Sequence, residues 1–162
     1  GVLFLDDPSE PVFAARFDGE RWYVLDAGLR EPARCLAWWE GAPVAGGSFR
    51  VEEGSSADYL ARWDGSLWRT FTGGAPDGRV STLAVHDGRL LAGGSFSGVG
   101  PVAAAYLAAF DGCRWTPLPA KAATGFDDRV LCFHSDGDEL YAAGWFLRAG
   151  GRPVARVARW RP

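Results

Sequence analysis

The chain has 162 residues and a mass of 17.4 kDa, with 48% hydrophobic residues, 23% charged residues and a formal net charge of −3. This length and composition are typical of one globular domain with a sizeable hydrophobic core. Because no stretch approaches the roughly 20 apolar residues of a membrane-spanning helix, and because the pI near 5.4 leaves no excess of basic charge, we expect no membrane insertion and no nucleic-acid partner.

Two short motifs recur along the chain. Gly-Gly-Ser-Phe occurs at 46–49 and 93–96, and the degenerate form Ala-Gly-Trp-Phe occurs at 143–146, so the phenylalanines are spaced by 47 and then 50 residues. Fourteen residues after the phenylalanine of each copy stands another aromatic residue, usually followed by Asp-Gly: Trp63, Phe110 and Trp160. Phe17, also followed by Asp-Gly, is an earlier aromatic of the same kind, before the first copy. The repeats divide the chain into units at approximately 1–32, 33–78, 79–128 and 129–162.

The second and third units are each expected to hold four antiparallel strands and the first and fourth units three each, which makes fourteen strands. In the third unit, alternating strand formers and Asp-Gly turns at 87–88 and 111–112 predict two hairpins. The strands of this unit are expected over 80–85, 89–96, 105–110 and 113–118. The glycine pair inside the second strand indicates a β-bulge or a close approach of backbone, because glycine has no side chain to pack. In the first unit, 1–5 is expected to be a degenerate second strand.

Four strands repeated with a period of about 40–50 residues are the signature of a β-propeller blade. The strings Ala-Arg-Trp-Asp-Gly-Ser-Leu-Trp at 61–68, Gly-Gly at 73–74 and Leu-Leu-Ala-Gly-Gly-Ser-Phe at 90–96 resemble the repeat of kelch and galactose-oxidase-like propellers. The closest resemblance is to bacterial secreted or surface propellers and to fungal cortical-marker membrane proteins. It implies an all-β propeller segment of about three and a half four-stranded blades. It also implies a non-enzymatic interaction or structural module that is extracellular or associated with the cell envelope.

The segment is expected to belong to a larger ring or to a ring completed by an oligomer. The fourth unit ends at 160–162 without the Asp-Gly turn and second tryptophan of the earlier units, and the first unit has no recognisable first strand. An open arc would expose sheet faces and strand edges that need a cover. We therefore expect further blades of the same polypeptide, a protein partner or a second copy of the chain to pack against 1–4 and 156–162.

The tryptophans fall into repeated and unrepeated positions. Trp22, Trp68 and Trp115 share one position of the unit and the aromatic residues at 17, 63, 110 and 160 share another, so both sets are expected to pack between sheets. The binding candidates lie outside these positions: Trp38, Trp39 and Trp145. A glycan is the ligand considered, since sugar faces stack on exposed aromatic rings. The pleat of a strand places the adjacent Trp38 and Trp39 on opposite faces.

Arginines crowd the end of the chain: Arg148, Arg152, Arg156, Arg159 and Arg161. Arg156 stands where the other units have Phe13, Tyr59 and Tyr106. Arg148, Arg152 and Arg156 are candidates for binding an anion or a partner. The favoured alternative is a blade edge whose arginines pair with acidic residues of a neighbouring segment.

No residue set indicates catalysis or a bound cofactor. His86 and His134 stand at different positions of their units without further metal ligands, and no Ser-His-Asp signature is present. The turn aspartates Asp18, Asp64, Asp87 and Asp111 are expected to accept hydrogen bonds from nearby backbone. For the acidic residues at 125–128 and 136–139, calcium binding is the alternative to a solvated hairpin.

The three cysteines are expected to be free thiols. Their number is odd and no C-x-x-C spacing occurs among Cys35, Cys113 and Cys132. With no catalytic set, two alternatives to an interaction module stay open. One is a glycan-binding lectin, and the other is a scaffold for an active site that is completed elsewhere in a larger enzyme.

Overall fold

The computed structural model describes residues 13–25, 28–51, 59–71, 73–118 and 125–161. In these ranges every regular element is a β-strand and every strand pair is antiparallel, which confirms the all-β prediction. None of the described residues belongs to a helix that has the length and apolar character to cross a membrane.

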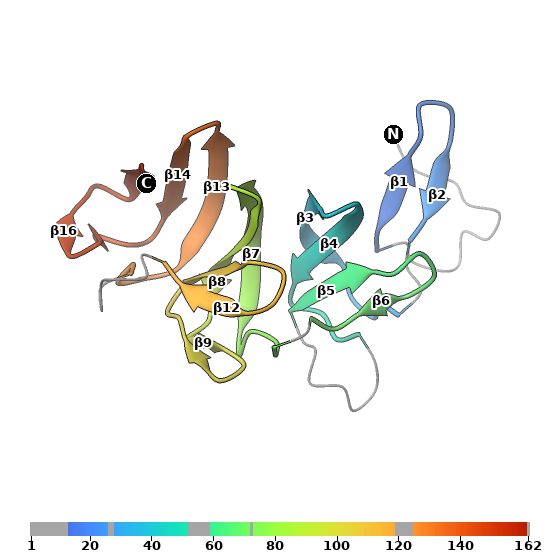
Figure 1. Ribbon diagram of the computed structural model, residues 1–162, viewed down its shortest axis with the longest axis horizontal. Helices are drawn as coiled ribbons and strands as arrows, with labels where there is room; N and C mark the ends of the chain where they lie inside the picture. The colour runs from blue at the N-terminus through green and yellow to red at the C-terminus, as the bar shows by residue number, and fades with distance from the viewer. Residues whose placement is uncertain (1–12, 26–27, 52–58, 72, 119–124, 162) are drawn as a thin grey trace.

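The strands form an N-terminal hairpin and three sheets, which follow one another across the molecule (Figure 1). The N-terminal hairpin consists of β1 (Ala15–Phe17) and β2 (Trp22–Val24). Sheet 1 consists of β3 (Ala33–Trp39), β4 (Ala42–Gly47), β5 (Leu60–Trp63) and β6 (Trp68–Arg69). Sheet 2 consists of β7 (Arg79–His86), β8 (Arg89–Ser95), β11 (Leu107–Phe110) and β12 (Trp115–Pro117). Sheet 3 consists of β13 (Val130–Asp136), β14 (Glu139–Gly144) and β17 (Val157–Trp160).

Sheet 2 confirms the meander predicted for the third unit, whereas the strand predicted over 1–5 lies outside the described residues. Two small hairpins were not predicted. They are β9 (Gly98–Val99) with β10 (Val102–Ala103), and β15 (Arg148–Ala149) with β16 (Arg152–Pro153). Their turn glycines, Gly100 and Gly150, have φ of 54° and 58° and donate to the carbonyls of Ala75 and Gly125. The signal was the glycine that stands four residues after Phe96 and after Phe146.

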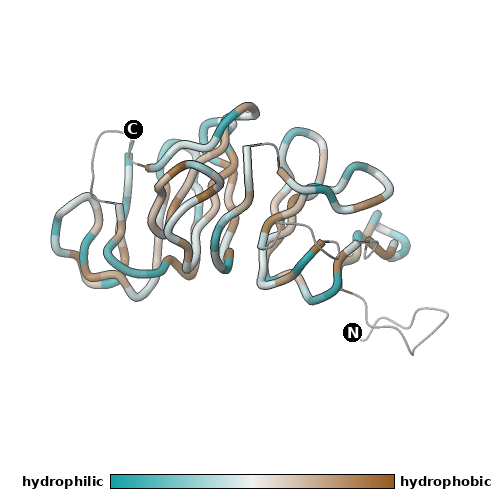
Figure 2. The backbone as a smooth tube through the Cα atoms, turned by 90° about the horizontal axis from the view of Figure 1, so that it is seen from below, coloured by the Kyte–Doolittle hydropathy of each residue, from teal (hydrophilic) through white to brown (hydrophobic). Residues whose placement is uncertain are grey.

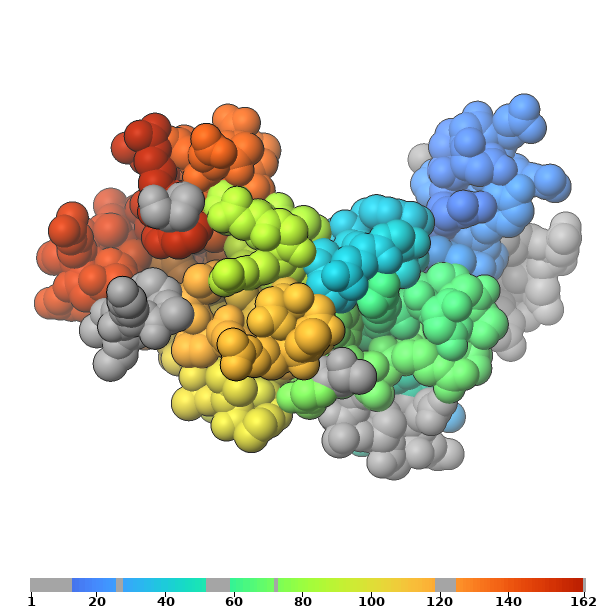
Figure 3. All heavy atoms as spheres, viewed as in Figure 1, coloured from blue at the N-terminus to red at the C-terminus, as the bar shows by residue number. Residues whose placement is uncertain are grey.

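The three sheets pack face to face, with their first strands closest together. β7 contacts β3 on one side and β13 on the other. The core between sheets 1 and 2 includes Trp39, Leu60, Leu90, Phe110 and Trp115, and the core between sheets 2 and 3 includes Leu91, Leu107, Val130, Phe133 and Phe146. Many hydrophobic residues lie along the stacked strands (Figure 2). The hairpin and sheet 3 lie at opposite ends of the molecule (Figure 3).

The glycine pairs occupy the places where backbone or neighbouring side chains approach most closely. The first strand has a register shift opposite the glycine pair in sheets 1 and 2, at Ala33/Cys35 and Val80/Thr82. Sheet 3 has the same shift, at Val130/Cys132, opposite Ala143 and Gly144. A Cβ on Gly94 would lie 2.0 Å from the Arg79 carbonyl oxygen, and one on Gly93 would lie 2.6 Å from the ring of Phe133 in the next sheet. The predicted bulge and close approach are both confirmed.

The structure also supports the alignment of Tyr59, Tyr106 and Arg156. All three have positive φ, at 80°, 67° and 65°. Their carbonyls accept hydrogen bonds from the second glycine of each motif, at 2.9, 3.1 and 3.1 Å. Arg156 therefore takes the same backbone role as the two tyrosines while it presents a different side chain.

The packing predicted for the repeated aromatic positions is confirmed for Trp68, Trp115 and Phe110, which are 1–3% exposed. It is wrong for Trp22 and Phe17, which are 50% and 51% exposed. Their rings contact each other at a centroid distance of 5.1 Å. The described part of the chain places no sheet over this side of the hairpin, so the same sequence position is a core position in one unit and a surface position in another.

We expect Trp68→Ala to lower the free energy of unfolding by about 3–5 kcal/mol. The Trp68 side chain is buried between the hairpin and sheet 1, and its indole N–H donates to the Leu25 carbonyl, so truncation leaves a cavity and an unpaired acceptor. Trp22→Ala is the matched control at the same repeat position and is expected to cost less, because this ring is half exposed. Urea denaturation followed by circular dichroism measures both. Equal losses would contradict this assignment.

Candidate functional site

The two adjacent tryptophans of β3 have different environments. Trp38 is 62% exposed, whereas Trp39 is 2% exposed and packs against Phe71 and Phe110. The Trp39 indole N–H donates to the Gly88 carbonyl in sheet 2 at 3.0 Å. Trp39 is therefore a core residue that ties sheet 1 to sheet 2. Its candidacy as a binding residue is corrected, because the pleat turns it toward the next sheet.

Trp38 lines an open groove between the N-terminal hairpin and sheet 1. The groove has a volume of about 500 Å³. Its lining includes Trp38, Tyr23, Trp63, Arg16, Asp64 and Pro43. The Tyr23 ring is covered by two guanidinium groups, with Cζ of Arg16 at 5.1 Å and of Arg21 at 5.3 Å from the ring centroid. Aromatic faces and cationic donors thus meet in one hollow on the surface.

Trp38 is exposed because its position in the sheet lies outside the packed face. The equivalent residues next to the first hairpin turn are Val85 in sheet 2 and Ser135 in sheet 3. Val85 is 37% exposed although sheet 2 has a sheet on each side. This position therefore stays on the rim of the packed sheets, and sheet 1 carries its largest aromatic side chain there.

Trp145 forms a second exposed aromatic site, on sheet 3. Its side chain is 50% exposed, and the guanidinium carbon of Arg156 lies 4.9 Å from the ring centroid. Ser48 and Ser95 hold the equivalent position in the other units. The structure therefore brings together two of the predicted site residues, Trp145 and Arg156.

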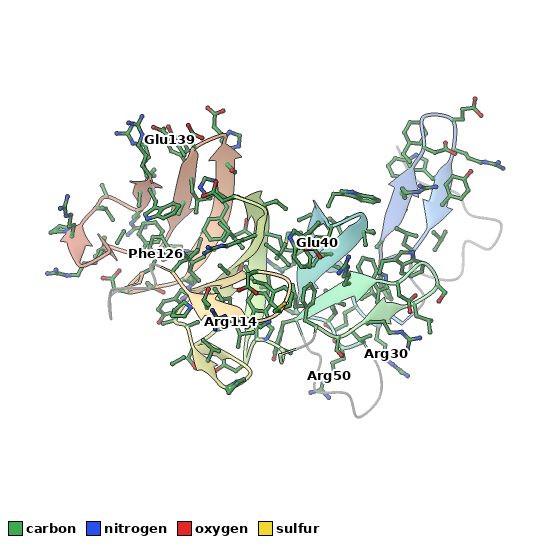
Figure 4. The ribbon with its side chains drawn as sticks, in the orientation of Figure 1. Arg30, Glu40, Arg50, Arg114, Phe126 and Glu139 are labelled. Carbon is green, nitrogen blue, oxygen red and sulfur yellow. The ribbon has the colours of Figure 1, made fainter. Side chains whose placement is uncertain are left out.

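The arginines of the last unit do not form one anion site. Arg148 and Arg152 lie on the β15–β16 hairpin, where the Arg148 guanidinium donates to the Gly151 carbonyl at 3.2 Å. Arg159 and Arg161 instead form ion pairs with Glu139, which lies at the end of the molecule away from the N-terminal hairpin (Figure 4). Hydrogen bonds from the Tyr141 hydroxyl and the Arg161 guanidinium hold the pKa of Glu139 below its ordinary value.

The structure brings together His86, Asp87 and Ser135, a grouping that the sequence analysis did not predict. His86 Nδ1 lies 2.9 Å from Ser135 Oγ, and its Nε2 lies 3.8 Å from Asp87 Oδ2. The imidazole is 5% exposed and packs edge-on against Trp160. His86 stands at the position that Trp39 holds in sheet 1, and this place in the repeat is the sequence feature that could have indicated a contact between sheets. The contact ties sheet 2 to sheet 3 as Trp39 ties sheet 1 to sheet 2, and 3.8 Å is too long for a hydrogen bond.

Three of the four turn aspartates have the predicted role; the fourth, Asp87, has a φ of 49° in its turn, and among the described residues its carboxylate accepts no backbone hydrogen bond. Asp18, Asp64 and Asp111 each accept hydrogen bonds from the backbone N–H groups two and three residues later, at 2.8–2.9 Å. Asp127 similarly accepts from Leu147 and Arg148, both at 2.8 Å. The backbones of Asp136 and Glu139 are register partners at the β13–β14 turn. Among the described residues no group of three or more His, Cys, Asp or Glu side chains converges as a metal site.

The three cysteines are free, as expected. Cys113 and Cys132 are exposed, whereas Cys35 is half-buried. Burial raises the pKa of the Cys35 thiol to about 12, so this thiol stays protonated and unreactive near neutral pH.

No protein-family model and no curated protein matches the chain. In the part of the chain that the structure describes, the groove beside Trp38 and the pair formed by Trp145 and Arg156 each combine an exposed tryptophan with a guanidinium group.

We expect the N-terminal hairpin turn to lose stability in acid. Backbone hydrogen bonds from Arg21 and Glu20 lower the pKa of Asp18 from 3.8 to about 2. Since the folded pKa is the lower one, the charged carboxylate stabilises the fold above pH 3.8, and this stabilisation is lost as the pH falls through about 2. Thermal unfolding between pH 5 and pH 2 measures the effect.

Asp18→Asn is expected to reduce the acid dependence of the melting temperature, because an amide at this position does not titrate. Asp138→Asn is the control, since its carboxylate accepts no hydrogen bond in the described part of the chain. An acid dependence that is unchanged in Asp18→Asn would refute the role assigned to the Asp18 carboxylate.

Proposed function

We propose that this chain is a segment of a β-propeller that acts as a non-enzymatic interaction or structural module. The observation that carries the proposal concerns the residues that depart from the repeat. Trp38 replaces Val85 and Ser135, Trp145 replaces Ser48 and Ser95, and Arg156 replaces Tyr59 and Tyr106. The three departing side chains are all exposed. Repeated residues such as Trp68, Trp115 and Asp64 serve packing and turns, so these three departures mark exposed positions whose chemistry differs between units.

The chemistry of the departing residues favours recognition. Tryptophan and arginine are enriched at protein interfaces, where they combine a large contact area with directional polar groups. The repeated turn aspartates and the Nδ1 atom of His86 already have hydrogen-bond partners. The carboxylates of Asp18, Asp64 and Asp111 bind their own turns, and His86 joins two sheets.

The packing of the sheets supports a ring. Contacts between neighbouring sheets are made chiefly by the first strands, β3, β7 and β13, with the second strands beside them. The outer strands β6 and β12 lie farther apart in Figure 1 than the first strands β3 and β7. Sheets that are close along one strand and open toward the other are wedge-shaped, and wedges repeated in one direction close around an axis.

Cryo-electron microscopy of the natural polypeptide that contains this chain tests the proposal. The expected particle is a disc with a central channel, lined by β3, β7, β13 and their equivalents. An elongated stack, in which the first strands follow one straight axis, would contradict the propeller. Turnover of a substrate at residues of the described sheets would contradict the non-enzymatic role.

A second candidate function, glycan binding, is favoured by the groove beside Trp38. The exposed Trp38 ring can stack on the apolar face of a sugar, while Arg16 can donate to sugar hydroxyls. Asp64, although it lines the groove, already accepts hydrogen bonds from Ser66, Leu67 and Arg69. The ligand expected here is therefore a neutral or anionic saccharide.

Glycan-array binding followed by titration calorimetry tests this candidate. We expect Trp38→Ala to weaken glycan binding by about tenfold or more, since a sugar stacks on the exposed face of the aromatic ring that this substitution removes. Trp145→Ala, an equally exposed tryptophan at the other end of the chain, is expected to leave affinity unchanged. Loss of binding in Trp145→Ala alone would move the site to sheet 3, and an array without any bound glycan would reject the candidate.

A further inference from the structure

An apolar cavity lies between sheets 2 and 3. Its volume is about 130 Å³, and the residues that line it belong to the described part of the chain. Leu107 and Leu118 come from the third unit, and Leu140, Ala158 and Trp160 come from the fourth. An engineered apolar cavity of about 150 Å³ binds benzene in another protein, so a space of this size and lining suits an aromatic ring.

The equivalent place between sheets 1 and 2 is filled by the side chain of Trp115. One unit earlier, the positions that line the cavity belong to the core cluster that contains this tryptophan: Leu60, Phe71, Leu90, Ala108 and Phe110. Trp115 is 3% exposed, and its ring centroid lies 5.0 Å from that of Phe110 and 5.8 Å from that of Phe71. The cavity between sheets 2 and 3 therefore has the lining of a tryptophan site.

The same place between the N-terminal hairpin and sheet 1 is filled by Trp68, which is 1% exposed. Its indole N–H donates to the Leu25 carbonyl, and Leu118 stands at the position of Leu25 beside the cavity. The indole N–H of Trp115 has no hydrogen-bond partner among the described residues. Burial of the ring is thus the feature that the two tryptophan sites share, and a ligand of the cavity has to provide an aromatic ring.

One edge of β17 is open beside this cavity. Its equivalents, β5 and β11, each pair with a second strand on one side and with a fourth strand on the other. Among the described residues β17 pairs with β14 alone. In the complete sheets the fourth strand supplies the tryptophan, since Trp68 is the register partner of Trp63 and Trp115 is that of Phe110. A strand added to β17 in this register would place a tryptophan opposite Trp160.

The backbone of β17 is oriented to receive such a strand. In sheet 1 the backbone N–H of Asp64 donates to the Leu67 carbonyl, on the side of the fourth strand, at 3.0 Å. Because hydrogen-bonding directions alternate along an antiparallel strand, the N–H and carbonyl of Arg62, two residues earlier, point to the same side. Arg159 stands at the position of Arg62, so its N–H and carbonyl point to the open edge of β17.

The sequence after β17 is incompatible with the turn that connects the third and fourth strands of the earlier units. There the aromatic residue is followed by an aspartate and then by a glycine whose φ is 100–110°. After Trp160 the sequence has Arg161 and Pro162. Arginine has no acceptor for the N–H groups of the turn, and the ring of proline restricts φ to about −65°. A strand that pairs with β17 therefore has to reach it by another route than this hairpin.

We propose that the open edge of β17 and the adjacent cavity bind a strand of a partner polypeptide, antiparallel to β17, whose tryptophan side chain fills the cavity. In such strand addition, backbone hydrogen bonds provide affinity and the side-chain pocket provides specificity. A second copy of the chain is a poorer donor, because its Trp68 and Trp115 are buried in their own sheets and its Trp22 ring packs on Phe17. The inference rests on the sheet packing of the proposed interaction module, and it names the chemistry of its partner.

Titration calorimetry with synthetic peptides tests the proposal on the unaltered chain. The probe is a peptide with blocked termini and the sequence of residues 66–71, Ser-Leu-Trp-Arg-Thr-Phe, which contains the fourth strand of sheet 1. We expect it to bind at one site. Trp68→Ala in the peptide is expected to weaken binding by about tenfold or more, because it removes the ring that fills the cavity.

Two further peptides test the backbone pairing. Arg69→Pro in the peptide is expected to weaken binding by about tenfold or more, because Arg69 is the register partner of Arg62 and proline has no N–H to donate to the equivalent Arg159. Ser66→Ala is the control, since Ser66 precedes the strand and is expected to leave the affinity unchanged.

Ala149→Phe in the chain locates the site. Ala149 of β15 lines the cavity and is partly exposed, so a phenyl ring at this position is expected to occupy the cavity and to weaken binding of the peptide by about tenfold or more. Ala103→Phe is the matched control, because Ala103 of β10 is exposed and does not line the cavity. Circular dichroism verifies that both variants fold, and the peptide series needs no change to the chain.

Four outcomes would overturn the proposal. They are a chain that does not bind the unaltered peptide, equal affinity for the Trp68→Ala peptide, undiminished binding to Ala149→Phe, and self-association of the chain that is lost in Trp22→Ala. The last result, measured by sedimentation velocity, would show that a second copy supplies the ring. None of these measurements depends on whether the natural polypeptide is imaged as a ring, so failure of this inference is distinguishable from failure of the proposed propeller.

Discussion

The close approach of one sheet to the next depends on the missing side chains of the glycine pairs in the second strands of sheets 1 and 2, β4 and β8. Gly46 and Gly93 leave the space that Val80 and Phe133 of the following sheet occupy. Gly94 lies so near the Arg79 carbonyl that a Cβ would fit only after the backbone moved. The first strands can therefore lie against each other, and the position of every other strand follows from that contact.

The same contact determines where polar groups are tolerated. At the ends of the first strands, the indole of Trp39 and the imidazole of His86 each find a partner in the next sheet, the Gly88 carbonyl and the Ser135 hydroxyl. In the interior, the Thr82 hydroxyl accepts the backbone N–H of Phe133 at 3.0 Å. These bonds satisfy polar groups that are buried. A buried polar group without a partner lowers the stability of a fold by about 1–3 kcal/mol. Histidine and serine side chains that resemble parts of a catalytic array thus have a sufficient structural role.

Exposure has two different meanings on this surface. Leu36 and Trp38 lie two residues apart on the same face of β3, and both are more than half exposed. The position of Leu36 is buried in the other two sheets, so its exposure depends on what lies beside sheet 1 and not on the position itself. The position of Trp38 stays open in sheet 2 even between two neighbours, so its exposure is available to a ligand. The repeat makes this distinction possible, because each position is seen in more than one environment.

The sequence by itself determined the unit, the strands of the third unit, the hairpin turns and the bulge, because these features depend on residues close together in the chain. Asp64 followed by glycine specifies its turn wherever the turn lies, and a glycine pair weakens side-chain packing in any strand. Tertiary structure decided which repeated residues are buried. Trp68 and Trp22 share a position and differ from 1% to 50% in exposure, because a neighbouring sheet covers one and not the other. It also separated Arg156 from Arg159 and Arg161, and brought His86 to Ser135 from 49 residues away. Such contacts join different sheets, and the local pattern of a strand contains no information about which side chains face it from the next.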